Sequence, residues 1–372
     1  MSKRGKAKVL LYLHALSGGG AERVMALLAS GLSQSAFDVV LAVDYPASDN
    51  EIYLDPSVRR ETLGSNHFVS VVKLASLLAR EKPDVSVSAL CGSNLKHFLA
   101  AGLVGRLDRA VLSYHGFYQS EPQFLSRISY LLTPLLTRAA SGTLAVSNAL
   151  RTNLIEQWHA SKSRTRLIYN PVVWRPRPSS ITTEMLQSRP ATVLASGRLI
   201  PLKNFDGLVR AFARVSPPSA RLIILGDGPE RPRLEAEIAR LGLTGRVDLP
   251  GYIRDPWDYY AQASCFVVSS RSESFGMTVV EALANGLPVV STDCGGPAEI
   301  LVRSEDGTIV PLDDEMALAG AITAALADPG SPSLRMQTAE RFAVPRAIDA
   351  YESLIAEIAG RARSPVPICE PA

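Results

Sequence analysis

Short apolar runs alternate with longer amphipathic segments along almost the whole chain of 372 residues. In the first half, the runs of strand length occupy Lys8–Leu13, Asp38–Val43, Val85–Ala89, Ala110–Tyr114 and Thr143–Val146. In the second half they occupy Thr192–Ser196, Arg221–Leu225, Val247–Leu249, Cys265–Val268 and Pro288–Thr292. Segments with the helical period lie between them, and we expect helices at Ala21–Leu32, Phe205–Arg214, Arg231–Leu241 and Thr278–Asn285. Apolar strands that alternate with helices predict two parallel sheets of the α/β class, each covered by helices on both faces.

A proline-rich stretch from Asn170 to Pro178 shows neither the helical nor the strand period of apolar residues. It separates the two halves, so it is the predicted linker. At roughly 150 residues per domain, the length also fits two domains. We therefore expect a first Rossmann-like domain at residues 1–173, a second at residues 174–346 and a flexible tail at residues 364–372. Two such domains in tandem leave a cleft between them. Because doubly wound domains bind ligands beyond the carboxyl ends of their strands, binding residues are expected in the loops that follow strands.

The composition narrows the classes of function. The 39 Lys and Arg against 36 Asp and Glu leave a net charge of +3, which excludes a nucleic-acid binder that depends on bulk positive charge. Residues 1–177 carry 21 basic and 12 acidic residues (+9), and the remainder carries 18 and 24 (−6). The first half either faces anionic phosphate or lipid or is simply solvated unevenly. The four cysteines lie far apart, which argues against a disulfide framework and fits a reducing cytoplasm.

No apolar stretch is long enough to span a bilayer, since a span needs about 18 residues or more. The basic start of the chain followed by Val9–Leu16 is similar to a secretory signal. That run is short and contains His14, however, so a buried first strand is the better interpretation. The apolar stretch Ile128–Leu136 lies between Arg127 and Arg138. It is either part of the core or an interfacial element that contacts an anionic membrane.

A glycine-rich segment, Ser17–Arg23, follows the first predicted strand and opens a helix. Glycines such as Gly19 and Gly20 let the backbone approach a ligand, and the N–H groups at the helix start attract anions. The dinucleotide fingerprint G-x-G-x-x-G has Arg23 where its third glycine belongs, although Asp44 could serve as its ribose-binding acid. An NAD-dependent oxidoreductase is therefore one alternative, and a tight turn without a ligand is another.

Two cations, Arg198 and Lys203, lie five residues apart in the loop after the first strand of the second half. A guanidinium offers a fork of donors and an ammonium offers a compact charge, so the two can straddle a diphosphate. The other interpretation is an ordinary pair of exposed basic residues.

Two glutamates, Glu273 and Glu281, lie eight residues apart where a strand, a loop and a helix follow one another. The strand ends near Ser269, the loop carries Glu273, and Glu281 lies about one turn inside a helix that begins near Gly276. Each carboxylate can accept hydrogen bonds from the vicinal diol of a sugar or a ribose. The backbone amides near Phe275, Gly276 and Met277 are available to phosphate or sugar oxygens.

Over the whole chain, these segments resemble the GT4-family (glycosyltransferase group 1) retaining glycosyltransferases, which have the GT-B fold. The most specific part is Glu273–Val290, which contains the E-x7-E pair. The resemblance also rests on Gly19-Gly20-Ala21-Glu22, Gly197-Arg198-Leu199 with Lys203, Gly226-Asp227-Gly228-Pro229-Glu230, Gly251-Tyr252 and Gly295-Gly296-Pro297-Ala298-Glu299-Ile300. It implies two Rossmann-like doubly wound domains that face a central cleft, an acceptor domain followed by a nucleotide-sugar donor domain. It also implies a C-terminal helix, at about residues 347–363, that crosses back to the first domain.

The resemblance also assigns roles to single residues. Arg198 and Lys203 match the basic pair that stabilises the donor diphosphate, Glu281 the glutamate on the ribose, and Glu273 the one near the donor sugar. His115 matches a histidine beside the donor sugar, although a lone histidine is often only structural. The expected catalytic residues are His115, Arg198, Lys203 and Glu273. The expected donor-binding residues are Gly19, Gly20, Gly197, Arg198, Lys203, Gly226, Tyr252, Ile253, Glu273, Ser274, Phe275, Gly276, Met277 and Glu281.

The activity implied by the resemblance is transfer of a sugar, with retention, from a UDP- or GDP-linked donor to a saccharide or lipid-linked acceptor. Such enzymes are described as using front-face attack, and no metal or other cofactor is expected. Asp313 and Asp314 lie in a late polar loop, where capping or solvation is the simpler interpretation. We expect a cytoplasmic protein, with peripheral contact to an anionic membrane as a further expectation and no nucleic-acid partner. A non-catalytic nucleotide-sugar-binding protein on the same fold is the remaining alternative.

Overall fold

The computed structural model describes residues 6–35, 37–47, 49–121, 123–173 and 181–360. The chain divides into two compact units. Unit 1 contains the described residues up to Pro171 together with those from Phe342 onward, and unit 2 is Val172–Arg341. Most of the predicted linker, from residue 174, and the predicted tail at residues 364–372 lie outside the described residues.

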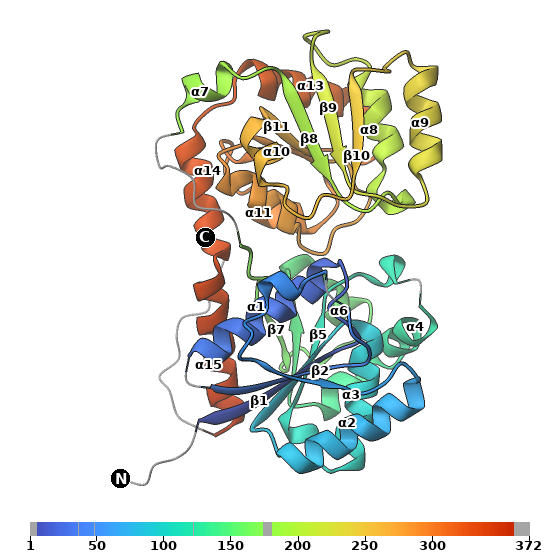
Figure 1. Cartoon of the computed structure of the whole chain (residues 1–372), viewed down its shortest axis with the longest axis vertical. Coiled ribbons are helices and arrows are strands. Elements are labelled where there is room, and N and C mark those ends of the chain that lie inside the picture. Colours follow the sequence, from blue (N-terminus) through green and yellow to red (C-terminus); the bar gives the residue numbers. More distant parts are fainter. Residues whose placement is uncertain (1–5, 36, 48, 122, 174–180, 361–372) are drawn as a thin grey trace. The chain divides into compact units, whose positions relative to one another are not determined.

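Unit 1 is built on a seven-stranded parallel sheet with the strand order β3-β2-β1-β4-β5-β6-β7 (Figure 1). Its strands are β1 (Ala7–Leu13), β2 (Phe37–Val43), β3 (Arg59–Thr62), β4 (Val85–Ala89), β5 (Ala110–Tyr114), β6 (Gly142–Ala145) and β7 (Thr165–Leu167). The strand β1 is buried almost throughout and pairs in parallel with β2 and β4. The basic start of the chain therefore leads into a central strand, as predicted.

Helices cover both faces of the sheet of unit 1. Alternate residues of β1 point to opposite faces, so Val9 and Leu11 join one apolar core and Leu10 and Tyr12 join the other. The first core is closed by α1 (Gly20–Gln34) and α15 (Val344–Ile358), and the second by α2 (His67–Glu81) and α3 (Cys91–Leu103). The other helices of this unit are α4 (Phe124–Leu131), α5 (Thr133–Ala139) and α6 (Asn148–Glu156).

The last described helix, α15, belongs to unit 1 although it follows unit 2 in the sequence. Its buried residues Ile348, Tyr351 and Leu354 pack into the core that α1 closes, and the two helices lie side by side (Figure 1). Polar contacts fix the same helix, since Arg166 forms an ion pair with Glu357 and Arg109 donates to the carbonyl of Ile358 (2.6 Å). A helix at the end of the chain thus completes the first unit, as the resemblance implied.

Unit 2 is built on a six-stranded parallel sheet with the order β10-β9-β8-β11-β12-β13. Its strands are β8 (Thr192–Ser196), β9 (Arg221–Leu225), β10 (Val247–Gly251), β11 (Cys265–Val268), β12 (Val289–Thr292) and β13 (Gly307–Val310). Its helices are α7 (Thr183–Gln187), α8 (Phe205–Phe212), α9 (Arg231–Arg240), α10 (Trp257–Gln262), α11 (Met277–Ala284), α12 (Gly296–Ile300), α13 (Glu315–Ala327) and α14 (Pro332–Ala339).

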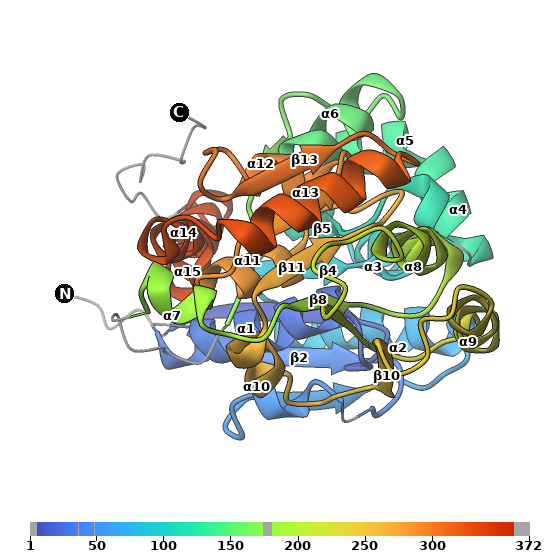
Figure 2. The ribbon, with the colours of Figure 1, turned by 90° about the horizontal axis from the view of Figure 1, so that it is seen from above.

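One face of the sheet of unit 2 is covered by α8, α9 and α13. Leu208, Leu234 and Ile322 of these helices share an apolar core with β8 and β9, and α13 lies beside α8 (Figure 2). Near the other end of the strand order, α11 packs against α14. Both units are therefore doubly wound parallel sheets, which confirms the predicted α/β class.

The structure adds strands that the apolar pattern does not predict, namely β3, β7 and β13. Each lies at an edge of its sheet and is short, and β3 has the polar sequence Arg-Arg-Glu-Thr. An edge strand has one neighbour and is exposed on its free side, so it need not be apolar throughout. The stretch Ile128–Leu136 is likewise not one element, because it is divided between α4 and α5.

Among the described residues, no helix is both long and apolar enough to cross a membrane. The three described cysteines, Cys91, Cys265 and Cys294, are buried and free, and Cys369 lies outside the described residues.

Candidate functional site

The strand order of each unit reverses direction at one point. In unit 2, the chain proceeds outward from β8 through β9 to β10 and then begins again on the other side of β8 with β11. Crevices for ligands form at such switch points, beyond the carboxyl ends of the two central strands. The loop after β8 contains Gly197, Arg198 and Lys203, and the loop after β11 contains Glu273. The topology alone thus places these predicted residues at the carboxyl edge of the sheet of unit 2.

Lys203 and Glu273 are in direct contact. The Lys203 ammonium forms an ion pair with Oε1 of Glu273, and the Ser270 hydroxyl donates to the same oxygen (2.8 Å). The two side chains are 22% and 18% exposed, so the pair is held at the surface of the loops rather than inside the core. An anionic ligand that reached Lys203 would share this cation with Glu273.

Glu281 lies inside α11 and is only 2% exposed. The hydroxyl of Tyr260, from α10, donates a hydrogen bond of 2.8 Å to Oε2 of Glu281. Tyr260 is itself fully buried and stacks on Phe266 of β11. The orientation of this carboxylate is therefore fixed by a tyrosine that is itself fixed by packing.

Two predicted glycines let neighbouring strand ends approach each other. Gly226 has a φ of 137°, and a Cβ atom there would lie 1.9 Å from the carbonyl oxygen of Gly197. Gly197 also faces Lys203, whose Cε would be 3.2 Å from a Cβ on Gly197. Only glycine fits position 226, because any side chain would push the loop after β8 away from the loop after β9.

The segment after Glu273 is held by the next loop of unit 2. The amide of Glu273 donates to the carbonyl of Cys294 (2.8 Å), and the amide of Gly296 donates to the carbonyl of Glu273 (2.8 Å). A Cβ on Gly296 would collide with the backbone of Phe275 at 2.4 Å. The two glycine-containing motifs at 273–276 and 295–296 therefore form one packed unit, which ends with Gly276 as the N-cap of α11 (φ 104°).

The remaining predicted residues of unit 2 differ in exposure. Arg198 is exposed, and its guanidinium forms no ion pair with any other described residue. Tyr252, which follows β10, is 60% exposed, and Ile253 and Ser274 are half-buried. Phe275 and Met277 are buried, so only their backbone could meet a ligand.

In unit 1, Gly19 and Gly20 lie at the start of α1, directly after β1. The side chain of Asn50 donates to the carbonyls of Ser17 and Gly19, the latter at 3.2 Å, and thus holds this loop from the side. The Glu22 carboxylate folds back over Gly19, since a Cβ there would lie 2.1 Å from its Oε2. The conformation of this loop is therefore held by the side chains of Asn50 and Glu22.

His115 follows β5, and its Nε2 lies 3.0 Å from the hydroxyl of Ser113. Burial lowers the pKa of His115 from 6.5 to about 4, so its imidazole is neutral near pH 7. Gly19, Gly20 and His115 lie beyond the carboxyl ends of β1 and β5, two strands apart in the same sheet. The structure brings them to the same edge of this sheet.

Asp44, the acid considered for NAD binding, has another role. It is 2% exposed and accepts hydrogen bonds from Lys96 Nζ (2.5 Å) and Tyr12 Oη (2.9 Å). Because both carboxylate oxygens have buried partners, Asp44 is unsuited to a ribose, and the dinucleotide alternative loses its acid as well as its third glycine. Asp314, in contrast, caps α13 by accepting from the amide of Ala317 (2.8 Å), as expected.

Within the described ranges, no group of three or more His, Cys, Asp or Glu side chains gathers as a metal site would require. Two contacts of the candidate site leave no sign in the sequence pattern. One is Tyr260, which orients Glu281, and the other is Arg271, which contacts the loop of Lys203. Tyr260 has the sequence signature of a core aromatic, and Arg271 that of an exposed cation, so neither pattern indicates the contact.

Two family models match the chain, one in each half. Residues 18–173 match the family described as Glycosyltransferase Family 4, and residues 180–342 match the family described as Glycosyl transferases group 1. The second match contains Arg198, Lys203, Glu273 and Glu281.

The chain is also similar to individual glycosyltransferases. The lipopolysaccharide core biosynthesis glycosyltransferase LpsE of Rhizobium meliloti is 37% identical over 44% of this chain and 49% of its own length. The N-acetylgalactosamine-N,N'-diacetylbacillosaminyl-diphospho-undecaprenol 4-alpha-N-acetylgalactosaminyltransferase of Campylobacter jejuni is 28% identical over 84% of this chain and 88% of its own length. Matches to four relatives, LpsE among them, span only 25–56% of those proteins' lengths.

Among solved structures, HepE of Anabaena in complex with UDP and glucose matches with a TM-score of 0.79 and 23% identity, over 94% of this chain and 99% of that one. This likeness confirms the GT-B class of fold. With a glycosyltransferase family model matched in each half, the chain belongs to the GT4-type, group 1 glycosyltransferases.

Proposed function

We propose that this protein is a retaining glycosyltransferase of the hexosyltransferase type. It moves a sugar from a UDP- or GDP-linked donor to a saccharide or lipid-linked saccharide during synthesis of a bacterial cell-surface polysaccharide or glycolipid. The names of the relatives support the class of product, since LpsE is a lipopolysaccharide core enzyme and the Campylobacter jejuni relative is named for a diphospho-undecaprenol-linked saccharide. The complex of HepE with UDP and glucose supports the class of donor.

The observation that carries the proposal is the arrangement at the switch point of unit 2. The Lys203–Glu273 pair lies where the loops after β8 and β11 meet, and Arg198 belongs to the first of these loops. Glu281 lies on α11, the helix that follows the second loop, and its carboxylate is oriented there by Tyr260. This edge therefore offers two cations for a diphosphate and two carboxylates for the hydroxyl groups of a ribose and a sugar.

The proposed chemistry follows from where charge develops. Breaking the bond between sugar and phosphate leaves negative charge on the diphosphate and positive charge on the anomeric carbon. Arg198 and Lys203 stabilise the first, because a cation beside the leaving group offsets the negative charge as it develops, and losing one such group costs about 3–4 kcal/mol of barrier. In a front-face reaction the departing phosphate oxygen accepts the proton of the acceptor hydroxyl. His115 is neutral near pH 7, so at its edge of unit 1 it can supply a hydrogen bond but no charge.

We also propose a peripheral contact with an anionic membrane through α4 and α5. Phe124, Leu131 and Leu135 on these helices are each more than half exposed, which is costly in water unless the patch has a partner. Arg127 and Arg138 are exposed on the same two helices. Apolar side chains flanked by cations suit a membrane surface, where they contact acyl chains and anionic headgroups. Such a contact would bring the enzyme to the membrane that holds a lipid-linked acceptor.

The test of the proposed activity is a panel of nucleotide sugars, with release of UDP or GDP as the readout. We expect release from one donor or a few, and faster release once a suitable saccharide acceptor is added. Thermal shift separates the alternatives, because UDP or GDP at about 100 times its Kd should add roughly 2.7 kcal/mol of stability and NAD should add none. Stabilisation by NAD alone would favour an oxidoreductase, and binding of UDP or GDP without turnover of any donor would favour a non-catalytic binding protein.

A further inference from the structure

Arg271 lies in the loop after β11, two residues before Glu273, and makes contacts in two directions. Its side chain is 47% exposed, and by its exposure alone it would be an ordinary surface cation. Its partners, however, are residues of two other loops at the carboxyl edge of the sheet of unit 2.

The first direction is the loop that carries Lys203. The backbone amide of Arg271 donates to the carbonyl of Leu202 (2.8 Å), and its Nη2 donates to Oδ1 of Asn204 (3.1 Å). The hydroxyl of Ser269 donates to the carbonyl of Lys203 itself (2.8 Å). Hydrogen bonds from the loop after β11 thus reach Lys203 and the residue on either side of it.

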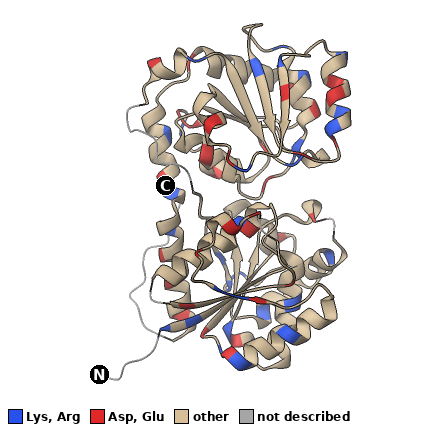
Figure 3. Ribbon diagram, in the orientation of Figure 1, with Lys and Arg blue, Asp and Glu red and all other residues tan. Residues whose placement is uncertain are grey.

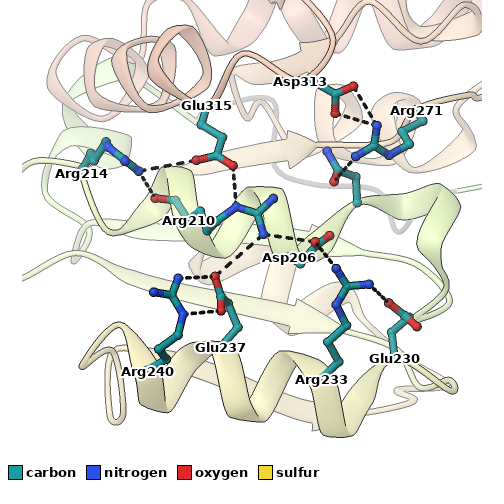
Figure 4. A network of polar contacts seen from close by, with 11 residues as sticks. Asp206, Arg210, Arg214, Glu230, Arg233, Glu237, Arg240, Arg271, Asp313 and Glu315 are labelled. Carbon is teal, nitrogen blue, oxygen red and sulfur yellow. Dashed lines mark hydrogen bonds and ion pairs between the residues drawn. The ribbon is translucent and has the colours of Figure 1, made fainter.

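The second direction is the loop between β13 and α13. Nη1 of Arg271 donates to Oδ2 of Asp313 (2.7 Å), and Figure 4 shows the guanidinium facing this carboxylate. Asn204 and Asp313 both have left-handed backbone conformations, with φ of 51° and 59°. For residues other than glycine this conformation is uncommon and persists where the surroundings hold it. The planar guanidinium carries its donors in a rigid fork, so it holds two such loops at once with less loss of side-chain freedom than a compact ammonium.

We propose that Arg271 is a positioning residue for the transfer reaction. Its guanidinium ties the loop after β8 to the loop after β13, and so holds the backbone of Lys203 where the ammonium can meet both Glu273 and the donor diphosphate. Arg271 itself need not touch the substrate. The proposal rests on the proposed function, because it assigns a geometric role within the same donor site.

A neighbouring arginine provides the control. Arg233 of α9 also makes two ionic contacts, with Asp206 (3.0 Å) and Glu230 (3.1 Å), and its side chain is 62% exposed. It belongs to the surface network drawn in Figure 4, and Figure 3 shows acidic and basic residues interspersed along the same helix. Exposed ion pairs of this kind contribute little to stability. Arg233→Ala therefore removes a comparable arginine with no contact to the loop of Lys203.

The experiment compares Arg271→Ala, Arg271→Lys and Arg233→Ala with the wild-type chain. We expect Arg271→Ala to lower kcat about 10- to 100-fold, the scale of a small misplacement of a reacting group, with a Tm close to that of Arg233→Ala. Arg271→Lys should recover part of the loss, and guanidinium ion at millimolar concentration should rescue Arg271→Ala but not Lys203→Ala. Hydrogen exchange at the amides of residues 203–204 should be about tenfold faster in Arg271→Ala and unchanged in Arg233→Ala.

The exchange rates and the kcat values together test whether Arg271 positions Lys203. Unchanged exchange at residues 203–204 overturns the proposal, because Arg271 then does not hold the loop. Faster exchange with a kcat within twofold of wild type also overturns it, because the loop then need not be held for the reaction. If the wild-type chain turns over no nucleotide sugar, the proposed function fails instead, and the exchange data still report whether Arg271 holds the loop.

Discussion

At the scale of single residues, the candidate site depends on pairs in which one side chain fixes another. Glu273 pairs with Lys203, and Tyr260 orients Glu281. The two members of the first pair could be anticipated as site residues, since both follow predicted strands and match family motifs, but their contact with each other could not. The second could not, because the hydrogen bond joins positions 21 residues apart in the chain, and only the packing of α10 against the sheet brings them together.

Lys203→Ala should lower turnover at least about a hundredfold. The ammonium matters most when negative charge develops on the diphosphate, so its loss raises the barrier more than it weakens ground-state binding of the donor. Steady-state kinetics with the best donor of the panel would measure this, with Lys162→Ala at a residue outside the site as the control. Turnover within a few fold of wild type would contradict the assignment of Lys203 to the diphosphate.

Tyr260→Phe should weaken binding of UDP or GDP about tenfold. The substitution removes a hydrogen bond to a charged carboxylate while keeping the ring that stacks on Phe266. Calorimetry with the nucleotide and with an analogue that lacks both ribose hydroxyls tests the mechanism, because only the first should lose affinity. Tyr259→Phe, next to it in α10, is the matched control. An equal loss for both ligands would mean that Tyr260 acts on the fold and not on the ribose.

At the scale of elements, the central strands, the helices between them and the edge strand β10 could be predicted, and the other edge strands could not. Predicted and observed bounds of β4, β5, β8, β9 and β11 coincide, because these strands are buried on both faces and leave a continuous apolar run. The edge strands β3 and β7 leave no such run. The loops of the site could be predicted in part. Their glycines are visible in the sequence, but the sequence does not say which loops those glycines allow to approach each other.

Gly226→Ala should destabilise unit 2 by several kcal/mol. Its Cβ would lie 1.9 Å from the carbonyl oxygen of Gly197, and its φ of 137° is unfavourable for alanine. Gly242→Ala separates the two effects, since Gly242 also has a positive φ (66°) but nothing within 4 Å of a Cβ. Urea unfolding should show a loss of about 1 kcal/mol for Gly242→Ala and a clearly larger one for Gly226→Ala. Equal losses would show that close approach of the two loops is not essential.

At the scale of the whole molecule, the chain combines two doubly wound units, and the C-terminal helix α15 belongs to the first of them. We propose that one unit binds the donor and the other the acceptor, as the resemblance to GT4-family enzymes implies. The sequence indicated this duplication through the repeated alternation of strands and helices. It could not indicate that the apolar stretch 128–136 is divided between two helices, which leaves some of its leucines buried and others exposed.

The exposed leucines lead to a prediction about the membrane. Wild-type protein should sediment with vesicles that contain anionic lipid at low salt, and Leu131→Ser/Leu135→Ser should bind them at least about tenfold more weakly, since burial of each leucine contributes about 1.5–3 kcal/mol. Met316→Ser, which removes an exposed apolar side chain from unit 2, should have no effect. Binding that is absent in the wild type, or equal in the double variant, would remove the membrane contact from the account.

The most direct test of the central claim is a crystal structure of the chain with UDP or GDP bound. We predict a diphosphate against the cations of the loop after β8, with the Lys203 ammonium in contact with both the phosphate and Glu273. We also predict ribose hydroxyls on Glu281. A nucleotide bound away from the carboxyl ends of β8 and β11, or none bound at saturating concentration, would contradict the claim that this edge of unit 2 is the donor site.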